Sequence, residues 1–219
     1  MAAVTKKCVG YLACLRQYMA DAAVCPPVVH GHFFCPRTVL VIEFFEFKLN
    51  KNNSLFLFGA RGCGKSTLLR LIAGLLYATA GSIRTEGRIA LADENLALDA
   101  NLTVEKALMF WADMDGASGD ARSAALADMD LQALAQVPVR FLSTGQRKRA
   151  SIARVLAAKA DIWLLDEPYN GLDSASCARL DQAITAHTAT GGIVLVAAHQ
   201  PPSINVAHSL ILDRPEANA

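Results

Sequence analysis

A glycine-rich turn between a hydrophobic run and a helix-like run constrains most strongly how this chain can fold. The turn reads Gly59-Ala60-Arg61-Gly62-Cys63-Gly64-Lys65-Ser66, which matches the pattern G-x-x-x-x-G-K-[ST]. It follows the apolar residues 55–58 and precedes a helix-like run over residues 66–76. A strand, this turn and a helix in that order are typical of the phosphate loop of α/β proteins. The pattern therefore predicts that backbone N–H groups and Lys65 bind phosphates, and that the Ser66 hydroxyl binds Mg²⁺.

Two carboxylates end a second hydrophobic run. Residues 162–165 are uncharged and are followed directly by Asp166, Glu167 and Pro168. Such a run is typical of a central parallel strand buried on both faces, and open α/β sheets bind ligands at the carboxyl ends of their strands. An acid pair at the end of an uncharged strand needs a cation or a chemical task. We expect Asp166 to lie on the Mg²⁺ side and Glu167 to polarise an attacking water molecule.

The segment Leu142-Ser143-Thr144-Gly145-Gln146 allows two interpretations. Ser143 and Gln146 have the S-x-x-Q spacing of a capping box, which is a local reason for a helix to begin there. However, residues 147–149 are Arg, Lys and Arg, and cations in the first turn oppose the helix dipole. A helix start with a serine and a glycine is also suited to a phosphate from another molecule. The sequence leaves both roles open.

Together these motifs resemble those of ABC-type ATPase subunits. They are accompanied by Asn170-Gly171-Leu172-Asp173 and by His199 after the apolar residues 193–198. The stretches FLSTGQRKRASIARVLA, IWLLDEPYNGLD and GGIVLVAAHQP are similar, more narrowly, to the haem-exporter ATP-binding subunits of cytochrome c biogenesis, the CcmA family. The resemblance covers residues 36–213. It implies ATP hydrolysis with Mg²⁺, on an α/β fold with a RecA-like P-loop NTPase core, an antiparallel β part and an inserted helical subdomain.

The resemblance also implies roles for individual residues. The ATP phosphates would contact Gly59, Ala60, Arg61, Gly62, Cys63, Gly64, Lys65, Ser66 and Thr67. Glu167 and His199 would be catalytic, while Ser66 and Asp166 would hold the metal. The ATP bound by a second copy would be capped by Ser143, Thr144, Gly145 and Gln146, with Asp173 at the dimer seam.

Partners and location follow from the same resemblance. Because the chain has one phosphate loop and no internal repeat, the ATP sandwich is expected to need a homodimer. The expected membrane partner is an integral permease subunit of CcmB type, at the cytoplasmic face of a bacterial inner membrane. Nucleic acid is not expected, since the net charge is only +1 and residues 147–149 are the one basic cluster. The alternatives are an ATPase of another transporter, or a non-transport ABC protein that acts on nucleic acid or in assembly.

Two departures from the family pattern concern the expected site. Related subunits carry a glutamine in the loop that joins the core to the helical subdomain, but no glutamine occurs between Gly81 and Thr103. Glu94 or Asn95 would have to replace it, which makes Glu94 a candidate additional Mg²⁺ ligand. Within the phosphate loop, Cys63 replaces a small residue and is expected to place a thiol close to the nucleotide.

The expected organisation is an atypical N-terminal segment (residues 1–35), one ATPase domain (36–213, with the helical subdomain at about 103–158) and a short tail (214–219). A chain of 219 residues with 53% hydrophobic content can bury roughly 70% of its unfolded surface, enough for one core. No run approaches the length of about 20 apolar residues that spans a bilayer, so any membrane attachment is expected to come from a partner.

Periodicity predicts the remaining elements. Residues 39–49 are rich in β-formers and are expected, with a strand over residues 54–58, to make the antiparallel β part. Helices are expected over residues 65–76 and near 175–188, and strands over 193–198 and 209–212. Phe110, Trp111 and Met114 share one helix face, for which core packing is the default and contact with a membrane partner the alternative.

Overall fold

The computed structural model describes residues 31–32, 49, 51–78, 80–81, 83–199 and 208–212. Most of the N-terminal segment predicted for residues 1–35 lies outside the described residues, and so does the predicted tail. The same holds for Phe33, Phe34 and Arg37, which sequence patterns suggest as candidates for an adenine contact.

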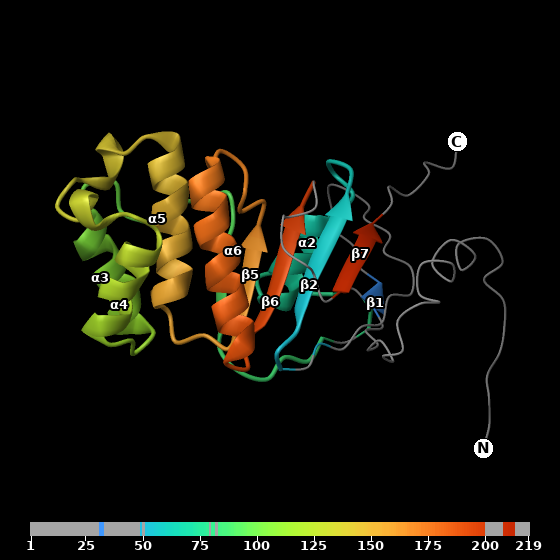
Figure 1. The fold of residues 1–219 in the computed structure, drawn as a ribbon. Coiled ribbons are helices and arrows are strands. Elements are labelled where there is room, and N and C mark those ends of the chain that lie inside the picture. Colours follow the sequence, from blue (N-terminus) through green and yellow to red (C-terminus); the bar gives the residue numbers. More distant parts are fainter. Residues whose placement is uncertain are drawn as a thin grey trace, which may run out of the picture.

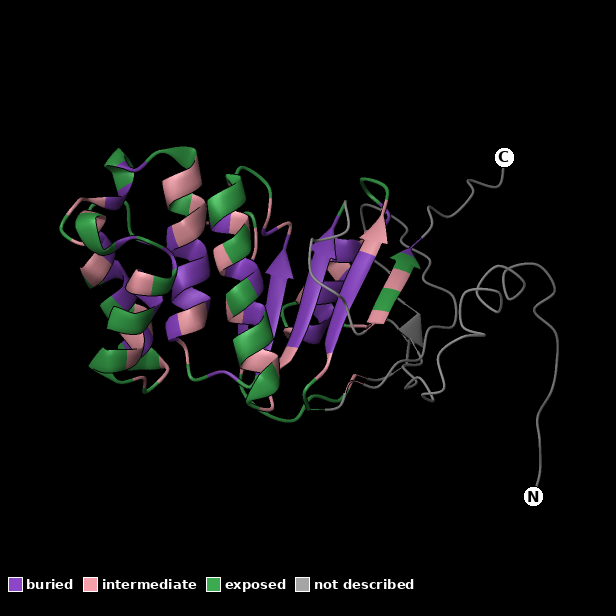
Figure 2. Ribbon diagram, in the orientation of Figure 1, coloured by how far each residue is buried: buried purple, intermediate pink, exposed green. Residues whose placement is uncertain are grey.

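A parallel sheet of five strands forms the centre of the described structure. Its spatial order is β4 (Ile89–Ala92), β5 (Ile162–Asp166), β6 (Ile193–Ala198), β2 (Ser54–Gly59) and β7 (His208–Leu212). Every neighbouring pair is parallel, so all five carboxyl ends lie at one edge (Figure 1). The middle strands are buried on both faces, as their unbroken apolar sequences predict (Figure 2).

The placement of residues 54–58 in an antiparallel part is wrong. This strand, β2, pairs in parallel with β6 on one side and β7 on the other. The physical reason is burial, because Leu55, Phe56 and Leu57 are all inside the core and need partners on both faces. The described antiparallel pair is instead β1 (Gly31–His32) with β3 (Ala80–Gly81). Residues 39–48, the other half of that expectation, lie outside the described residues.

Alternate residues of the sheet face two different hydrophobic cores. Leu55 and Leu57 pack with Leu68 and Leu69 of α2 (Lys65–Ile72). Phe56 faces the opposite side, in the core that also contains buried residues of α6 (Ser174–Ala189). Helix α2 ends earlier than the predicted residue 76, because the chain reverses at Gly74 with φ of 74°.

Helices fill one end of the molecule, beyond β4 and β5 (Figure 1). They are α3 (Val104–Met114), α4 (Gly119–Asp128) and α5 (Thr144–Ala157), with the short 3₁₀ turns η1 (Gln132–Leu134) and η2 (Val139–Phe141). Helix α5 packs against α3 and α4 and also against β4, so it joins the helices to the sheet. Core packing is wrong for Phe110 and Met114, whose side chains are 56% and 67% exposed, whereas Trp111 is partly buried and packs against the core. No described helix is long and apolar enough to cross a bilayer.

Candidate functional site

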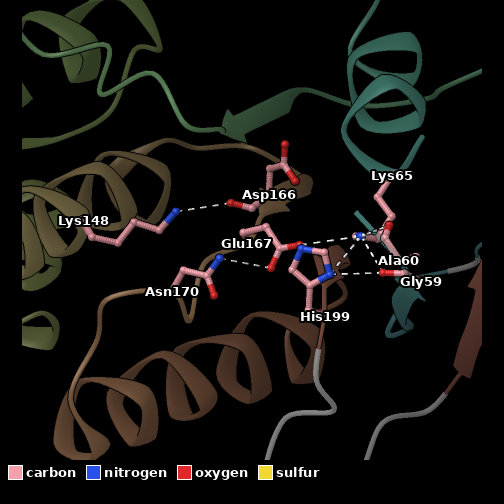
Figure 3. Close-up of polar contacts among 8 residues, drawn as sticks. All are labelled: Gly59, Ala60, Lys65, Lys148, Asp166, Glu167, Asn170 and His199. Atoms are coloured by element: carbon pink, nitrogen blue, oxygen red, sulfur yellow. Dashed lines mark hydrogen bonds and ion pairs between the residues drawn. The ribbon is translucent and has the colours of Figure 1, made fainter. Parts of the chain in front are cut away.

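Strand register brings three sequence motifs to one place. Leu57 of β2 and Asp166 of β5 both lie opposite Ala197 of β6. The residues that follow this row, Gly59, Glu167 and His199, therefore emerge together at the carboxyl edge of the sheet (Figure 3). This edge is where open parallel sheets bind ligands.

The phosphate loop begins with a glycine that no other residue could replace without a clash. Gly59 has φ of 153°, and a Cβ there would collide with the carbonyl oxygen of Leu212 and with the Cys63 sulfur. Gly64, at φ of 103°, then turns the chain into α2 without a side-chain cap. The first N–H groups of α2 are thus left for a ligand, which is the property that makes helix N-termini bind phosphate.

Lys65 is folded back over its own loop. Its side chain is only 6% exposed, and Nζ lies 3.8 Å from Glu167 Oε1. Nζ donates to the carbonyl oxygens of Gly59 at 2.8 Å and Ala60 at 3.2 Å. A buried ammonium group needs such acceptors, and it is positioned to exchange them for phosphate oxygens.

His199 and Glu167 contact each other directly. His199 Nε2 lies 3.1 Å from Glu167 Oε1, and Nδ1 lies 3.1 Å from the carbonyl oxygen of Gly59. Nδ1 also lies 3.4 Å from Lys65 Nζ, so contacts at both ring nitrogens fix the orientation of the imidazole. The pair connects the ends of β5 and β6 to the first residue of the phosphate loop.

Glu167 has a strained backbone. Its φ of 46° is left-handed, which costs a non-glycine residue roughly 1–2 kcal/mol. The conformation is held by a hydrogen bond from the Glu167 N–H to the Ala197 carbonyl oxygen at 2.8 Å. Strain that the surroundings enforce is found most often at functional sites, and here it directs the carboxylate toward Lys65 and His199.

Asp166 is suited to a bound cation. The residue is 1% exposed, and Oδ1 has no hydrogen-bond partner among the residues that the structure describes. Burial raises the pKa of this carboxyl group, while a hydrogen bond from Ser66 and the charge of Arg70 lower it. A buried carboxylate oxygen without a partner, beside a serine hydroxyl, matches the oxygen ligands that Mg²⁺ prefers. The donor set therefore fits the expected metal.

The loop without a glutamine brings Glu94 toward the same site. Glu94 is exposed, yet its charge raises the pKa of both Asp166 and Lys148. Asn95 is engaged elsewhere, because its backbone and side-chain nitrogens both donate to Asp93. Asp93 in turn pairs with Arg70 of α2 at 3.4 Å. Of the two proposed replacements, Glu94 has the better placement.

Helix α5 begins with a complete capping box. The Ser143 hydroxyl accepts from the Gln146 N–H at 3.3 Å, and Gln146 Oε1 accepts from the Ser143 N–H at 2.8 Å. A Cβ on Gly145 would lie 3.0 Å from the carbonyl oxygen of Gly171, so a glycine lets the two segments approach. A hollow between these segments is lined by Ser143, Gly145, Gln146, Arg149, Gly171, Leu172, Asp173 and Ser176.

The cations at the start of α5 bind carbonyl groups. Arg147 donates to Leu142 O, Lys148 to Asp166 O, and Arg149 to Met129 O. These contacts explain why cations occur near the N-terminus of α5 although they oppose the helix dipole, because each cation binds a carbonyl group outside the helix. Asp173 caps α6 by accepting from the Ser176 N–H at 2.7 Å, and that hydrogen bond lowers the Asp173 pKa.

Cys63 does not offer the accessible thiol that the sequence suggests. The residue is 2% exposed and packs in the core beneath the phosphate loop, with Leu55, Leu57 and Leu68. A thiol reagent would have to wait for this region to open.

Comparison with known proteins decides the family. The model of the family described as ABC transporter matches residues 42–170. The chain is 52% identical to a cytochrome c biogenesis ATP-binding export protein CcmA from Sphingopyxis alaskensis, over 73% of this chain and 82% of the relative. It is 48% identical to the protein of the same name from Zymomonas mobilis, over 82% and 81% of the two chains. The chain belongs to the ABC transporter family, among its CcmA members.

A solved structure agrees in fold. A Pyrococcus furiosus protein assigned as an ABC transporter ATP-binding protein superposes with a TM-score of 0.74 and 22% identity, covering 86% of this chain and 98% of its own. The predictions of an ABC-type ATP hydrolase, of an ATP-binding subunit most similar to CcmA and of a P-loop NTPase core are confirmed. The roles of single residues stay predictions.

Sequence patterns did not identify two contacts beside this ABC ATPase site. Lys148 binds the carbonyl oxygen of Asp166, and the Tyr169 hydroxyl donates to Asp181 at 2.7 Å. Burial, with this hydrogen bond, raises the pKa of Tyr169. The opposition between Lys148 and the helix dipole is a signal for the first contact, whereas the sequence contains no comparable signal for the second.

Proposed function

We propose that the chain is the ATP-hydrolysing subunit of a membrane exporter that serves cytochrome c biogenesis, with haem or a haem-linked product as the cargo. The observation that carries this proposal is the cluster of Lys65, Glu167 and His199 beside an Asp166 carboxylate oxygen that has no hydrogen-bond partner in the described part of the chain. The identity with CcmA proteins supports the cellular process. The assignment of haem as cargo rests on the family resemblance alone, because the described residues show no haem site.

The proposed chemistry divides among few side chains. Lys65 and the N–H groups at the start of α2 bind the phosphates of ATP, which compensates their negative charge. Glu167 orients and polarises the attacking water, and His199 contacts the terminal phosphate while its ring is held by the Gly59 carbonyl group. Ser66 and Asp166 would hold Mg²⁺, with Glu94 as a further candidate, and the metal would supply charge neutralisation at the phosphates.

A head-to-tail homodimer would complete each site. The hollow around Ser143, Gly145 and Asp173 lies at a helix start, where N–H groups and the helix dipole favour a phosphate from the second copy. ATP would then join the two copies, and hydrolysis would remove the bridge. Residues 143–146 thus cap the nucleotide of the other copy, and Asp173 lies at the seam.

The exposed face of α3 supports a membrane partner. A hollow there is lined by Ala97, Asp99, Leu102, Ala107, Phe110 and Trp111. Phe110 is exposed at this hollow, and Met109 and Met114 are further exposed apolar side chains of α3. The loop after β4 contributes Ala97 to this hollow and Glu94 to the surroundings of Asp166. We propose that a short helix of a CcmB-type permease binds here, on the cytoplasmic side of an inner membrane, so that its position is coupled to ATP hydrolysis.

Glu167→Gln tests the proposal. The variant keeps the shape of the side chain but loses the carboxylate, so hydrolysis should fall by about 10³-fold or more while ATP still binds. Because ATP then persists, the variant should form a dimer with ATP and Mg²⁺ in sedimentation velocity experiments. Glu86→Gln, an exposed glutamate paired only with Arg84 at the surface, is the matched control and should behave like the parent.

Two results would contradict the proposal. Hydrolysis by Glu167→Gln at the parent rate would remove Glu167 from the proposed chemistry. A variant that binds ATP but stays monomeric at all protein concentrations would rule out the ATP-joined homodimer.

A further inference from the structure

Lys148 connects the start of α5 to the hydrolysis site of its own chain. It is the fifth residue of α5, two positions after Gln146, the last of the residues proposed to cap the other copy's ATP. Its Nζ donates to the carbonyl oxygen of Asp166 at 3.2 Å (Figure 3). The side chain is partly buried, and burial lowers the pKa of Lys148 while the charges of Asp166, Glu167, Glu94 and Asp93 raise it. A partly buried cation thus lies near four acids.

The peptide group that Lys148 holds is the one that orients Glu167. The Asp166 carbonyl group and the Glu167 N–H belong to the same planar peptide unit. Lys148 binds its oxygen, and the Ala197 carbonyl oxygen accepts from its N–H at 2.8 Å. With both sides of the unit fixed, the left-handed φ of 46° at Glu167 is maintained against its strain.

The positive charge of Lys148 also compensates the negative charge of Glu94, which stands where related subunits have glutamine. Where related subunits have a neutral glutamine, this chain has a carboxylate whose charge reaches both Asp166 and Lys148. An added negative charge beside Asp166 and Glu167 would oppose the negative charge that develops during hydrolysis. Arg70 is engaged by Asp93, and Lys65 by the phosphate loop and Glu167. The surroundings of Lys148 include Glu94 together with the Asp166–Glu167 pair.

We propose that Lys148 is a positioning residue for hydrolysis: it holds the Asp166–Glu167 peptide from the start of α5 and offsets the charge of Glu94. This inference rests on the proposed function. It makes the helix that caps one nucleotide a direct support of the glutamate that acts on the other.

The test is a double-mutant cycle on the full-length chain. Lys148→Met and Lys148→Gln are each made alone and together with Glu94→Gln, and Lys148→Arg is the conservative variant. Lys106→Met, an exposed lysine of α3, is the matched control. The measurements are kcat and KM for ATP, the affinity for a fluorescent ATP analogue without turnover, and the thermal midpoint.

Lys148→Met should lower kcat about tenfold while KM and analogue affinity change by no more than about twofold, because the residue acts on Glu167 and not on the phosphates. Lys148→Arg should restore most of kcat. In the Glu94→Gln background Lys148→Met should lower kcat no more than about threefold, since the negative charge of Glu94 is no longer present. Lys148→Gln keeps a hydrogen-bond donor for the Asp166 carbonyl group, whereas Lys148→Met does not. Adding Glu94→Gln should therefore restore kcat more fully in Lys148→Gln than in Lys148→Met.

Several outcomes would overturn the inference. Parent kcat in both Lys148→Met and Lys148→Gln would do so, and so would a loss of kcat that tracks a loss of analogue affinity and of thermal midpoint. If Lys148→Met lowered kcat by the same factor in the parent and in the Glu94→Gln background, Lys148 would not offset the charge of Glu94. The proposed function is tested separately, because a Lys148 variant with parent activity beside an inactive Glu167→Gln would leave that function intact.

Discussion

At the scale of single residues, His187 shows how burial sets a protonation state away from the active site. Its ring stacks on Trp163 with centroids 3.8 Å apart and 5° between the planes. Nε2 is buried without a hydrogen-bond partner among the described residues. Burial lowers the His187 pKa, and the hydrogen bond to the Asp161 backbone and the charge of Asp161 oppose this only in part. The folded chain therefore favours the neutral ring.

This predicts a dependence of stability on pH. A histidine with a lowered pKa binds fewer protons when folded, so its contribution is complete above the unfolded pKa of about 6.5 and is lost as the pH falls toward the folded pKa. His187→Phe keeps the stacking and cannot be protonated. Chemical unfolding at pH 7.5 and 5.5 should show a smaller loss of stability in the variant than in the parent. An equal loss in both proteins would show that His187 is not neutral in the fold.

Residue identities in the site could be predicted where a motif fixes both spacing and chemistry. The phosphate loop and the acid pair after residue 165 are continuous in sequence, so their chemistry can be recognised without the fold. Lys148 and Asp166 are 18 residues apart, and Tyr169 and Asp181 are 12 apart, and only the packing of helices on the sheet brings each pair together. The burial of Cys63 was missed for the same reason, because the loop pattern does not tell which side of it faces the core.

At the scale of elements, the start of α5 combines a structural and a proposed binding role in one serine. Ser143 and Ser118 are both exposed N-caps whose hydroxyl groups accept one N–H at 3.3 Å. Either serine changed to alanine should cost about 1 kcal/mol of stability through the lost cap. Only Ser143→Ala should also weaken the ATP-dependent dimer of Glu167→Gln, by about tenfold, since hydrogen bonds to charged groups contribute about 1.5–3 kcal/mol.

Sedimentation equilibrium and urea unfolding of both variants separate the two roles. The Ser118→Ala variant is the control for the cap, because it lies at the start of α4 and not in the hollow around Asp173. If both variants weakened the dimer equally, residue 143 would act only through helix stability.

The sequence predicted whether a segment is a helix or a strand more reliably than it predicted which strands pair with each other. The strands before the phosphate loop and before Asp166, and the helix that ends at Ala189, lie close to their predicted ranges. The predicted pairing of β2 was wrong, because the β-forming residues just before this strand suggested an antiparallel hairpin. Pairing in a parallel sheet depends on contacts far apart in the chain, and here β2 lies between β6 and β7.

At the scale of the whole molecule, the loop after β4 joins the helical end to the sheet. Arg154 of α5 donates to the carbonyl group of Leu91, the second-last residue of β4, and its guanidinium lies 4.8 Å from the centre of the Trp111 ring. Trp111 of α3 donates to the Ala97 carbonyl group at 2.6 Å, near the end of the loop. Both ends of the segment that carries Glu94 are thus attached to helices, and we expect a movement of α3 to shift this loop beside Asp166.

A partner bound to α3 would act on the site through this connection, which gives a prediction for Phe110. Its ring is 56% exposed at the hollow proposed for the permease, so Phe110→Asp should place a charge in an apolar contact and weaken binding about tenfold or more. The thermal midpoint should stay near that of the parent, because little of the side chain is in the core. Tyr77→Asp, at a site that is 94% exposed and outside the lining of the hollow, is the matched control. The measurement is the fraction of each variant that co-purifies with membranes containing the permease. Retention of Phe110→Asp at the level of Tyr77→Asp would place the membrane contact elsewhere, whereas selective loss would assign it to the face of α3 that contacts the loop with Glu94.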